Sequence, residues 1–186
     1  MEYAVITPPV FVSIIVSAVL SSVFVGPWMK IALNRGRSVS PISTLIPENI
    51  LSPLAAANRE DAIRALCERA GAGLDRQAVA AAVFKREELM GTALGSGVAV
   101  PHAMMDEIAT PRLAFARAPS GIDWNAPDGL PVKFIFLLLT PPDNDRAQLQ
   151  LLQVIGKTMH SAENRDLLLA APDRDIGPLW VRLLNQ

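Results

Sequence analysis

Cysteine and histidine are the scarcest chemically reactive residues in this sequence of 186 residues. There is one cysteine, Cys67, and there are two histidines, His102 and His160. A single cysteine excludes an intrachain disulfide and a cysteine-based metal cluster, and two histidines argue against a zinc site. We therefore expect neither a metal nor a cofactor. Cys67 falls among the apolar positions of a helical pattern, which predicts a buried, unreactive thiol.

An excess of charge of either sign is also missing. Lysine and arginine number 17, aspartate and glutamate number 18, and the formal net charge is −1. A sequence-independent nucleic-acid binder needs a basic surplus to displace counterions from phosphates. The composition therefore predicts no nucleic-acid partner.

Charge is wholly absent from one stretch, Tyr3 to Met29. As a helix, residues 10–33 would be about 36 Å long, which exceeds a bilayer core of about 30 Å. Basic residues follow at Lys30, Arg35 and Arg37, so the positive-inside rule puts the C-terminal side in the cytoplasm. We expect residues 1–34 to form an apolar transmembrane-type helix that holds the chain in the inner (cell) membrane through residues 8–33.

Two other interpretations of this stretch stay open. A cleaved signal peptide carries its basic residues before the apolar run, whereas here they come after it. A buried helix of a soluble domain is a second alternative, although 27 uncharged residues are long for one. A lone spanning helix, or one split from a larger transporter, is the interpretation we favour.

The rest of the chain has the pattern of a globular domain. Glycine, proline and serine interrupt any periodicity over residues 35–46, which predicts a linker, and residues 47–186 form the expected domain. Apolar periodicity predicts helices over 59–70, 75–89, 143–159, 165–170 and 176–184, and strands over 98–100, 112–118 and 132–140. Strands interleaved with helices indicate an α/β fold, a single α/β sandwich.

The most informative motif runs from Arg86 to His102. A helical pattern ends in Arg-Glu, a loop with glycines at 91, 95 and 97 follows, and a short apolar strand leads to Pro101-His102. A neutral imidazole is a good nucleophile toward phosphorus, and Arg86 offers a planar donor fork for phosphate oxygens. A Pro-His pair alone is usually a surface turn, and the loop is neither a Walker A motif nor a dinucleotide fingerprint.

Taken whole, this motif resembles the active-site signature of the type-2 EIIA domains of the bacterial phosphotransferase system, which include fructose, mannitol and nitrogen-regulatory members. The likeness covers about 140 residues and continues through Gly121-Ile122-Asp123-Trp124, Asp128-Gly129-Leu130-Pro131-Val132, Pro141-Pro142-Asp143 and the helix near Gln148. It implies a mixed sheet flanked by helices. It also implies a phosphocarrier with a phosphohistidine intermediate rather than a free-standing enzyme.

The resemblance also assigns roles to residues. It implies that His102 accepts a phosphoryl group from a phosphorylated HPr-type protein and that Arg86 assists. Thr92, Gly95 and Gly97 would form the phosphoryl loop, and His160 is expected at the surface of a helix end.

Two positions depart from the family pattern. Gln148 stands where the family usually has a second histidine, and Gly91-Thr92-Ala93 stands where it usually has Ser-Thr-Gly. Glutamine can donate a hydrogen bond to a phosphoryl oxygen, but it cannot become cationic or relay a proton. Acceptance on His102 can therefore survive, whereas onward transfer to an EIIB-type component is the step that this change affects.

The uncharged N-terminal stretch has a resemblance of its own. Its segments Ile6-Thr7-Pro8-Pro9-Val10-Phe11, Leu20-Ser21-Ser22 and Gly26-Pro27 look like the last transmembrane helix of bacterial cation/proton antiporters. Three hypotheses follow: a phosphocarrier that regulates an attached or neighbouring membrane transporter, a non-transferring regulatory binding module of an antiporter, or a transport subunit with a structural adaptor.

Overall fold

The computed structural model describes residues 8–34, 45–142 and 144–184. The chain divides into two compact units, Met1–Arg37 and Ser38–Gln186, and each is described by itself. Residues 35–44 of the predicted linker, residue 143 at the predicted start of a helix, and Ile6-Thr7 of the antiporter-like segment lie outside the described residues.

The first unit is the helix α1, Pro8–Asn34, which confirms the helix predicted there. Proline suits its first turn, where a missing N–H costs little. The large apolar side chains that the structure describes in this unit, among them Phe11 and Phe24, are exposed. Within the described part of the chain, no helix combines the length and the apolar character needed to cross a membrane. The predicted anchor through residues 8–33, and the inner-membrane location that depended on it, therefore have no support from the structure.

The second unit is built on one six-stranded sheet, and its mixed character is as predicted. Its strands are β1 (Leu45–Leu51), β2 (Ala93–Gly95), β3 (Val98–Ala99), β4 (His102–Met104), β5 (Arg112–Ile122) and β6 (Val132–Thr140). The order is β1-β5-β6-β3-β2, and β4 also pairs with β6. The β1–β5, β3–β6 and β4–β6 pairs are parallel, whereas β5–β6 and β2–β3 are antiparallel.

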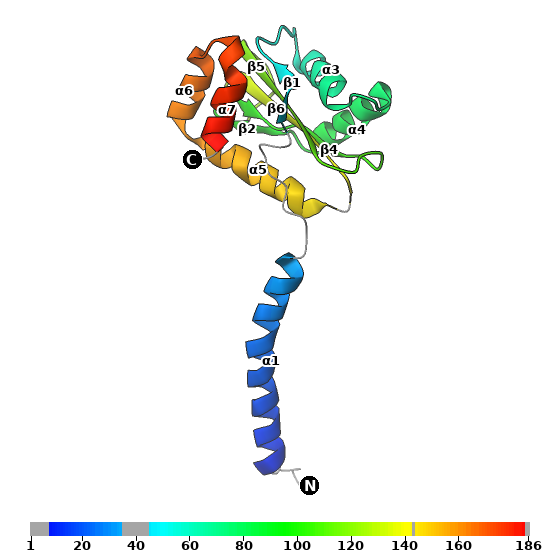
Figure 1. The fold of residues 1–186 in the computed structure, drawn as a ribbon, viewed down its shortest axis with the longest axis vertical. Helices are drawn as coiled ribbons and strands as arrows, with labels where there is room; N and C mark the ends of the chain where they lie inside the picture. Colours follow the sequence, from blue (N-terminus) through cyan, green and yellow to red (C-terminus); the bar gives the residue numbers. More distant parts are fainter. Residues whose placement is uncertain (1–7, 35–44, 143, 185–186) are drawn as a thin grey trace. The chain divides into compact units, whose positions relative to one another are not determined.

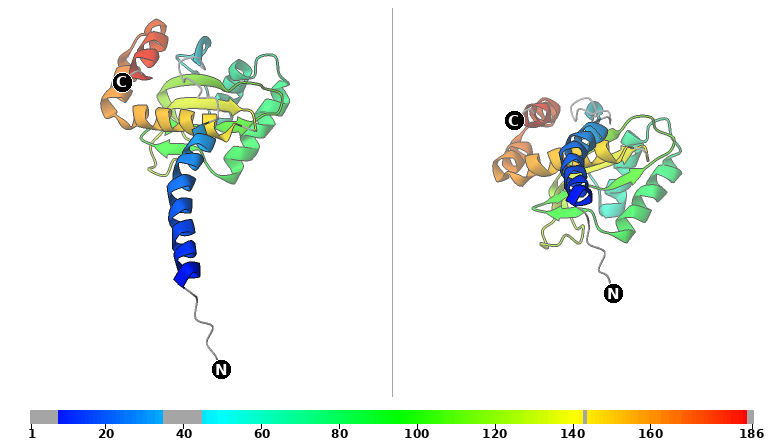
Figure 2. Two further views of the ribbon diagram at one scale, coloured as in Figure 1. Left: turned by 60° about the horizontal axis from the view of Figure 1, so that its bottom comes forward. Right: turned by 90° about the horizontal axis from the view of Figure 1, so that it is seen from below.

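Helices cover both faces of the sheet, which explains why β6 is apolar at almost every position. One face packs against α3 (Arg59–Ala70) and α4 (Arg76–Leu89). The other packs against α5 (Asp145–His160), α6 (Ala162–Ala170) and α7 (Ile176–Leu184), with the short 3-10 helix η1 (Asp173–Asp175) between the last two. Figures 1 and 2 show α3 beside α4, and α6 beside α7.

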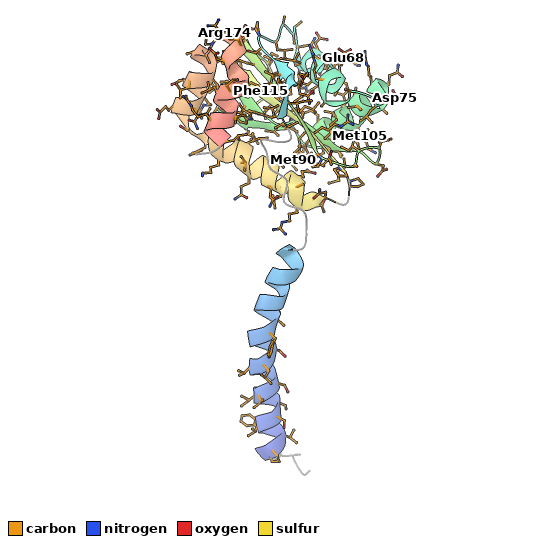
Figure 3. All side chains as sticks on the ribbon, in the orientation of Figure 1. Glu68, Asp75, Met90, Met105, Phe115 and Arg174 are labelled. Carbon is orange, nitrogen blue, oxygen red and sulfur yellow. The ribbon has the colours of Figure 1, made fainter. Side chains whose placement is uncertain are left out.

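Alternate residues of β6 divide between these two faces. Ile135 and Leu137 belong to the core under α3 and α4, whereas Phe134 and Phe136 belong to the core under α5 to α7. In the second core, Trp180 stacks on Phe115 with ring centroids 5.8 Å apart and lies 4.9 Å from Phe136. Figure 3 shows Phe115 inside this unit and Arg174 at its periphery.

Strand β1 is the main element that the sequence analysis missed. It begins at Leu45, inside the segment predicted as linker. The strand escapes recognition because Pro47 and the polar Glu48 and Asn49 conceal its alternation of apolar and polar residues. Proline is tolerated on edge strands, where one row of backbone groups has no strand partner, and β1 is the last strand at its end of the sheet. The short strands β2 and β4 were also missed, since three residues carry too little pattern to identify.

Cys67 is buried at 2% exposure, as predicted. Burial raises the pKa of its thiol to about 12, so the reactive thiolate is scarce at neutral pH. We expect a thiol reagent to modify the native chain at neutral pH far more slowly than the chain unfolded in denaturant, with one group modified per chain in both cases. Rapid modification of the native chain would contradict this burial.

Candidate functional site

His102 is the first residue of β4 and is half-buried. Its ring Nδ1 lies 2.9 Å from the carbonyl oxygen of Val100. A carbonyl can only accept a hydrogen bond, so Nδ1 carries the ring hydrogen and Nε2 keeps its lone pair in the neutral ring. The geometry therefore leaves Nε2 as the ring nitrogen whose lone pair is available.

The strand register shows which face of the sheet His102 occupies. His102 pairs with Leu138 of β6, and Met104 pairs with Thr140. Ala103, between them, belongs to the core under α3 and α4. Because side chains alternate along a strand, His102 lies on the opposite face, which α5 covers.

Gln148 lies on this same face. It sits in the first turns of α5, and its amide oxygen accepts a hydrogen bond from the hydroxyl of the buried Thr140 at 3.1 Å. Thr140 is one strand across and two residues along from His102, about 8 Å between Cα atoms. Since the oxygen of the Gln148 amide is held by Thr140, its N–H donors point away from that hydroxyl. The structure thus brings His102 and Gln148 to one region of one face.

The predicted phosphoryl loop is divided by the structure. The carbonyl oxygen of Thr92 accepts from the backbone N–H of Val100 at 3.0 Å, so Thr92 lies next to the residues that lead to His102. Gly97 instead accepts from Lys133 and Phe134 at the start of β6. Gly97 is five residues before His102, about 16 Å along an extended strand. Gly95 and Gly97 are therefore not brought to the ring of His102.

The glycines form a tight hairpin between β2 and β3. Gly95 has φ of +87° and Gly97 has φ of +76°, conformations that favour glycine. Asp128 holds this turn by accepting from the backbone N–H of Ser96. That hydrogen bond, with a second from Leu130, lowers the pKa of the Asp128 carboxyl. The Gly-x-Gly pattern thus has a structural role at the far end of β3.

Arg86 lies in the last turn of α4, and its guanidinium donates to the carbonyl oxygen of Met90 at 3.3 Å. Among the residues that the structure describes, no hydrogen bond joins Arg86 to His102 or Gln148. In this structure its donor fork is thus held at the end of its own helix.

Glu87 is a polar group that the sequence analysis missed. It is buried at 5% exposure and accepts from Trp124 Nε1 at 3.0 Å and from both the backbone N–H and the hydroxyl of Thr92. A signal was present, because Val79, Val83 and Glu87 recur at four-residue intervals on the inward side of α4. From the Arg-Glu motif, the sequence analysis predicts a role for Arg86 only.

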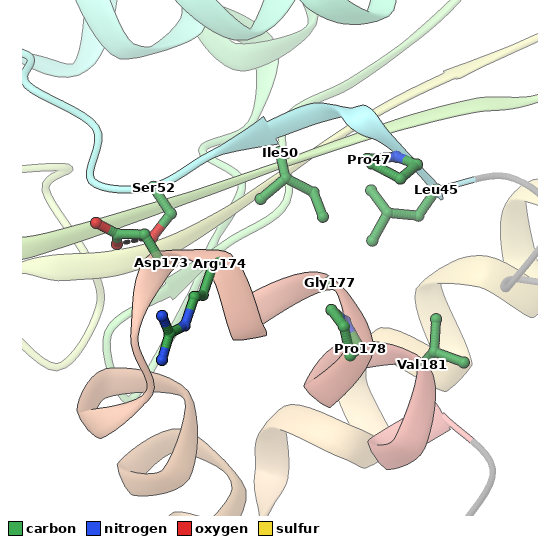
Figure 4. A pocket seen from close by; sticks show the side chains of 9 residues that line it. All are labelled: Leu45, Pro47, Ile50, Ser52, Asp173, Arg174, Gly177, Pro178 and Val181. Carbon is green, nitrogen blue, oxygen red and sulfur yellow. Dashed lines mark hydrogen bonds between the residues drawn. The ribbon is translucent and has the colours of Figure 1, made fainter.

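Other candidate positions lie apart from His102. His160 is exposed at the C-terminal end of α5, where a surface residue was predicted. Over the described ranges, no group of three or more His, Cys, Asp or Glu side chains could hold a metal ion. A cavity of about 600 Å³ lies between β1 and α7 (Figure 4), and none of the predicted site residues lines it.

Comparison with known proteins identifies the family. The sequence model of the "Phosphoenolpyruvate-dependent sugar phosphotransferase system, EIIA 2" family matches residues 44–176. A fructose-specific EIIA component of Haloferax volcanii is 34% identical over 140 residues, which are 73% of this chain and 91% of that protein. A nitrogen regulatory protein of Bradyrhizobium diazoefficiens is 33% identical, covering 72% of this chain and 89% of its own length. The match begins at residue 44, so it gives the antiporter resemblance of the N-terminal segment no support.

Solved structures show the same fold at lower identity. The crystal structure of the nitrogen regulatory protein IIA-Ntr from Neisseria meningitidis aligns with a TM-score of 0.69 and 24% identity, over 74% of this chain and 97% of that one. Enzyme IIA mannitol of Escherichia coli, solved in complex with phosphorylated enzyme IIB mannitol, aligns with a TM-score of 0.59 and 20% identity, over 76% and 96%. Together with the matched residues 44–176, these findings show that the chain belongs to the EIIA type-2 family of the phosphoenolpyruvate-dependent sugar phosphotransferase system.

Proposed function

We propose that residues 45–184 act in the cytoplasm as a phosphocarrier that accepts a phosphoryl group on Nε2 of His102 from a phosphorylated HPr-type protein. The observation that carries this proposal is the hydrogen bond from Nδ1 to the carbonyl oxygen of Val100. It leaves Nε2 as the nucleophile without a separate catalytic base. Membership of the EIIA type-2 family supports the same chemistry.

The transfer to His102 forms one bond and breaks one bond. The Nε2 lone pair forms a bond to phosphorus while the bond between phosphorus and the donor protein breaks, and the donor takes back that electron pair. The ring gains positive charge as the bond forms, and the Val100 carbonyl oxygen on Nδ1–H stabilises it. No proton needs to leave His102 during acceptance.

Two side chains are candidates for stabilising the transferring phosphoryl group. The N–H donors of Gln148 can reach its oxygens from α5, because Thr140 holds the other end of the amide. Arg86 can supply a cation from the end of α4 if its guanidinium releases the Met90 carbonyl. Phosphoryl transfer needs mainly such positioning and charge stabilisation.

Exposed apolar side chains are near neighbours in the sequence of His102, Arg86 and Gln148, which favours a protein partner over a small molecule. Leu89 and Met90 follow Arg86 and are 76% and 66% exposed, Met104 follows His102 by two residues, and Leu149 is 67% exposed beside Gln148. Exposed apolar groups of this kind, interspersed with polar ones, are typical of protein–protein contact surfaces. We infer that HPr-type and EIIB-type proteins dock here in turn.

A second candidate function is a regulatory module that is phosphorylated but passes its phosphoryl group on slowly. Gln148 favours it, because an amide cannot become cationic beside the departing group as a histidine can. The similarity to nitrogen regulatory proteins is compatible with this role.

The site assignment predicts how the chain is labelled. The full chain should take one phosphoryl group from phospho-HPr, and His102→Ala should abolish labelling while His160→Ala does not. The label should be stable in base and labile in acid, as an N–P bond is. Labelling with radioactive phosphate is measured on a gel. Equal labelling of wild-type and His102→Ala protein would show that the acceptor is another residue.

A second prediction concerns Arg86. Arg86→Lys keeps the charge but loses the bidentate fork, so acceptance should slow by roughly 10- to 1000-fold. Arg174→Lys is the matched control, since Arg174 is exposed on η1, away from α4. Rapid-quench measurement of acceptance decides the matter, and a rate for Arg86→Lys within twofold of the control would exclude the clamp.

The third prediction separates acceptance from onward transfer. Gln148→His places an ionisable ring next to the departing phosphoryl group, so it should speed transfer to an EIIB-type protein more than it speeds acceptance. Gln153→His, on an exposed position of the same helix, is the control. If Gln148→His changes neither rate, Gln148 does not contact the phosphoryl group.

A further inference from the structure

We propose that Glu87 is a positioning residue for His102, acting through Thr92 and Val100 to keep the imidazole in the tautomer with hydrogen on Nδ1. This inference rests on the proposed function, because positioning matters only if His102 reacts. It assigns the second residue of the Arg-Glu motif a task separate from that of Arg86.

The first part of the connection is a buried carboxylate surrounded by donors. One oxygen of Glu87 accepts from the backbone N–H of Thr92 at 3.2 Å and from Trp124 Nε1 at 3.0 Å, and the other accepts from the Thr92 hydroxyl. The guanidinium of Arg59 lies 3.8 Å away. An ionised carboxylate is an acceptor only, so it matches these neighbours.

The second part runs through the backbone to the ring. The carbonyl oxygen of Thr92 accepts from Val100 N–H at 3.0 Å, and the carbonyl oxygen of Val100 faces His102 Nδ1 at 2.9 Å. Glu87 thus accepts two hydrogen bonds from Thr92, Thr92 accepts one from Val100, and the carbonyl oxygen of Val100 accepts one from the ring. Each of these contacts is a hydrogen bond between described atoms.

Few other backbone N–H groups can hold residues 100–101, which lie directly before His102, in place. Pro101 has no N–H, so Val100 N–H is the last backbone donor before His102, and it is given to Thr92. On the other side, the carbonyl oxygen of Pro101 accepts from Leu138 N–H at 3.0 Å. Residues 100–101 are therefore held between Thr92 and β6. The hydrogen bonds from Thr92 to Glu87 fix Thr92, and through it the direction of the Val100 carbonyl.

The effect is positional rather than a relay of charge. The N–H and carbonyl groups of Val100 belong to different peptide units, so no proton passes from Glu87 to the ring. Glu87→Gln keeps the side-chain shape but removes the negative charge that strengthens these hydrogen bonds. Its amide oxygen can still accept from Thr92 N–H and Trp124 Nε1, but its NH2 group then faces the Thr92 hydroxyl, which has to accept instead of donate. We expect Thr92 to shift and the Nδ1–Val100 hydrogen bond to weaken.

The direct test is nitrogen NMR of the imidazole rings in the unphosphorylated full chain, in alkaline solution where histidine is neutral. Wild-type His102 should show mainly the Nδ1–H tautomer. In Glu87→Gln its signals should move toward the tautomer mixture shown by the exposed His160, which serves as an internal standard. Glu88→Gln, at the exposed neighbouring position, should leave the His102 signals unchanged.

Kinetics with phospho-HPr give the second readout. Glu87→Gln should lower the maximal rate of acceptance by about 10- to 100-fold, because small displacements of a reacting atom carry such costs, with little change in the donor concentration at half-maximal rate. A folded Glu87→Gln protein with unchanged tautomer and rate would overturn the proposal. If Glu87→Gln does not fold, Thr92→Val removes the hydrogen bond between the Thr92 hydroxyl and Glu87 at constant side-chain shape. An unchanged His102 tautomer in Thr92→Val then overturns the proposal.

The NMR test does not depend on the donor protein. If wild-type chain is not labelled at all, the proposed function fails, while the tautomer comparison still decides whether Glu87 positions the ring. If labelling occurs and the tautomer is unchanged, the proposed function stands and the positioning role fails.

Discussion

The hydrogen bond between His102 Nδ1 and the Val100 carbonyl oxygen is the contact on which the proposed chemistry depends. It decides which nitrogen is the nucleophile, removes the need for a base and stabilises the charge that develops on the ring. A backbone carbonyl can do this only if the chain before it is rigid. Here the pairing of β3 and β4 with β6, the proline at 101 and the Thr92–Val100 hydrogen bond supply that rigidity.

The surrounding fold sets what reaches this ring. Register between β4 and β6 puts His102 and Thr140 on the same face, and Thr140 in turn orients Gln148 at the start of α5. The opposite face carries α4, whose last turns supply Arg86 to the surface and Glu87 to the interior. His102 from β4 and Gln148 from α5 thus lie on one face of the sheet, and Arg86, the proposed clamp, lies at the end of α4.

Sequence reasoning could predict the helices, the long strands and the sandwich, because Asn58 and Asp75 cap their helices and β6 has an apolar run that only a doubly covered strand explains. It could point to His102 through the whole motif from Arg86 to His102 and its resemblance to the family signature, since a Pro-His pair alone is usually a surface turn. It could not predict the tautomer, which depends on a carbonyl two residues away, or the hairpin role of Gly95 and Gly97, which depends on pairing with Asp128 and β6. β1 was missed because an edge strand tolerates Pro47, and the membrane anchor inferred from an uncharged run has no support in the structure.

The central claim is that phosphorylation occurs on Nε2 of His102, and nitrogen and phosphorus NMR of the full chain after reaction with phospho-HPr tests it most directly. The account predicts a single phosphohistidine whose Nε2 signal is coupled to phosphorus, while Nδ1 keeps its hydrogen. Phosphorus bonded to Nδ1 of His102, or to His160, would contradict the account.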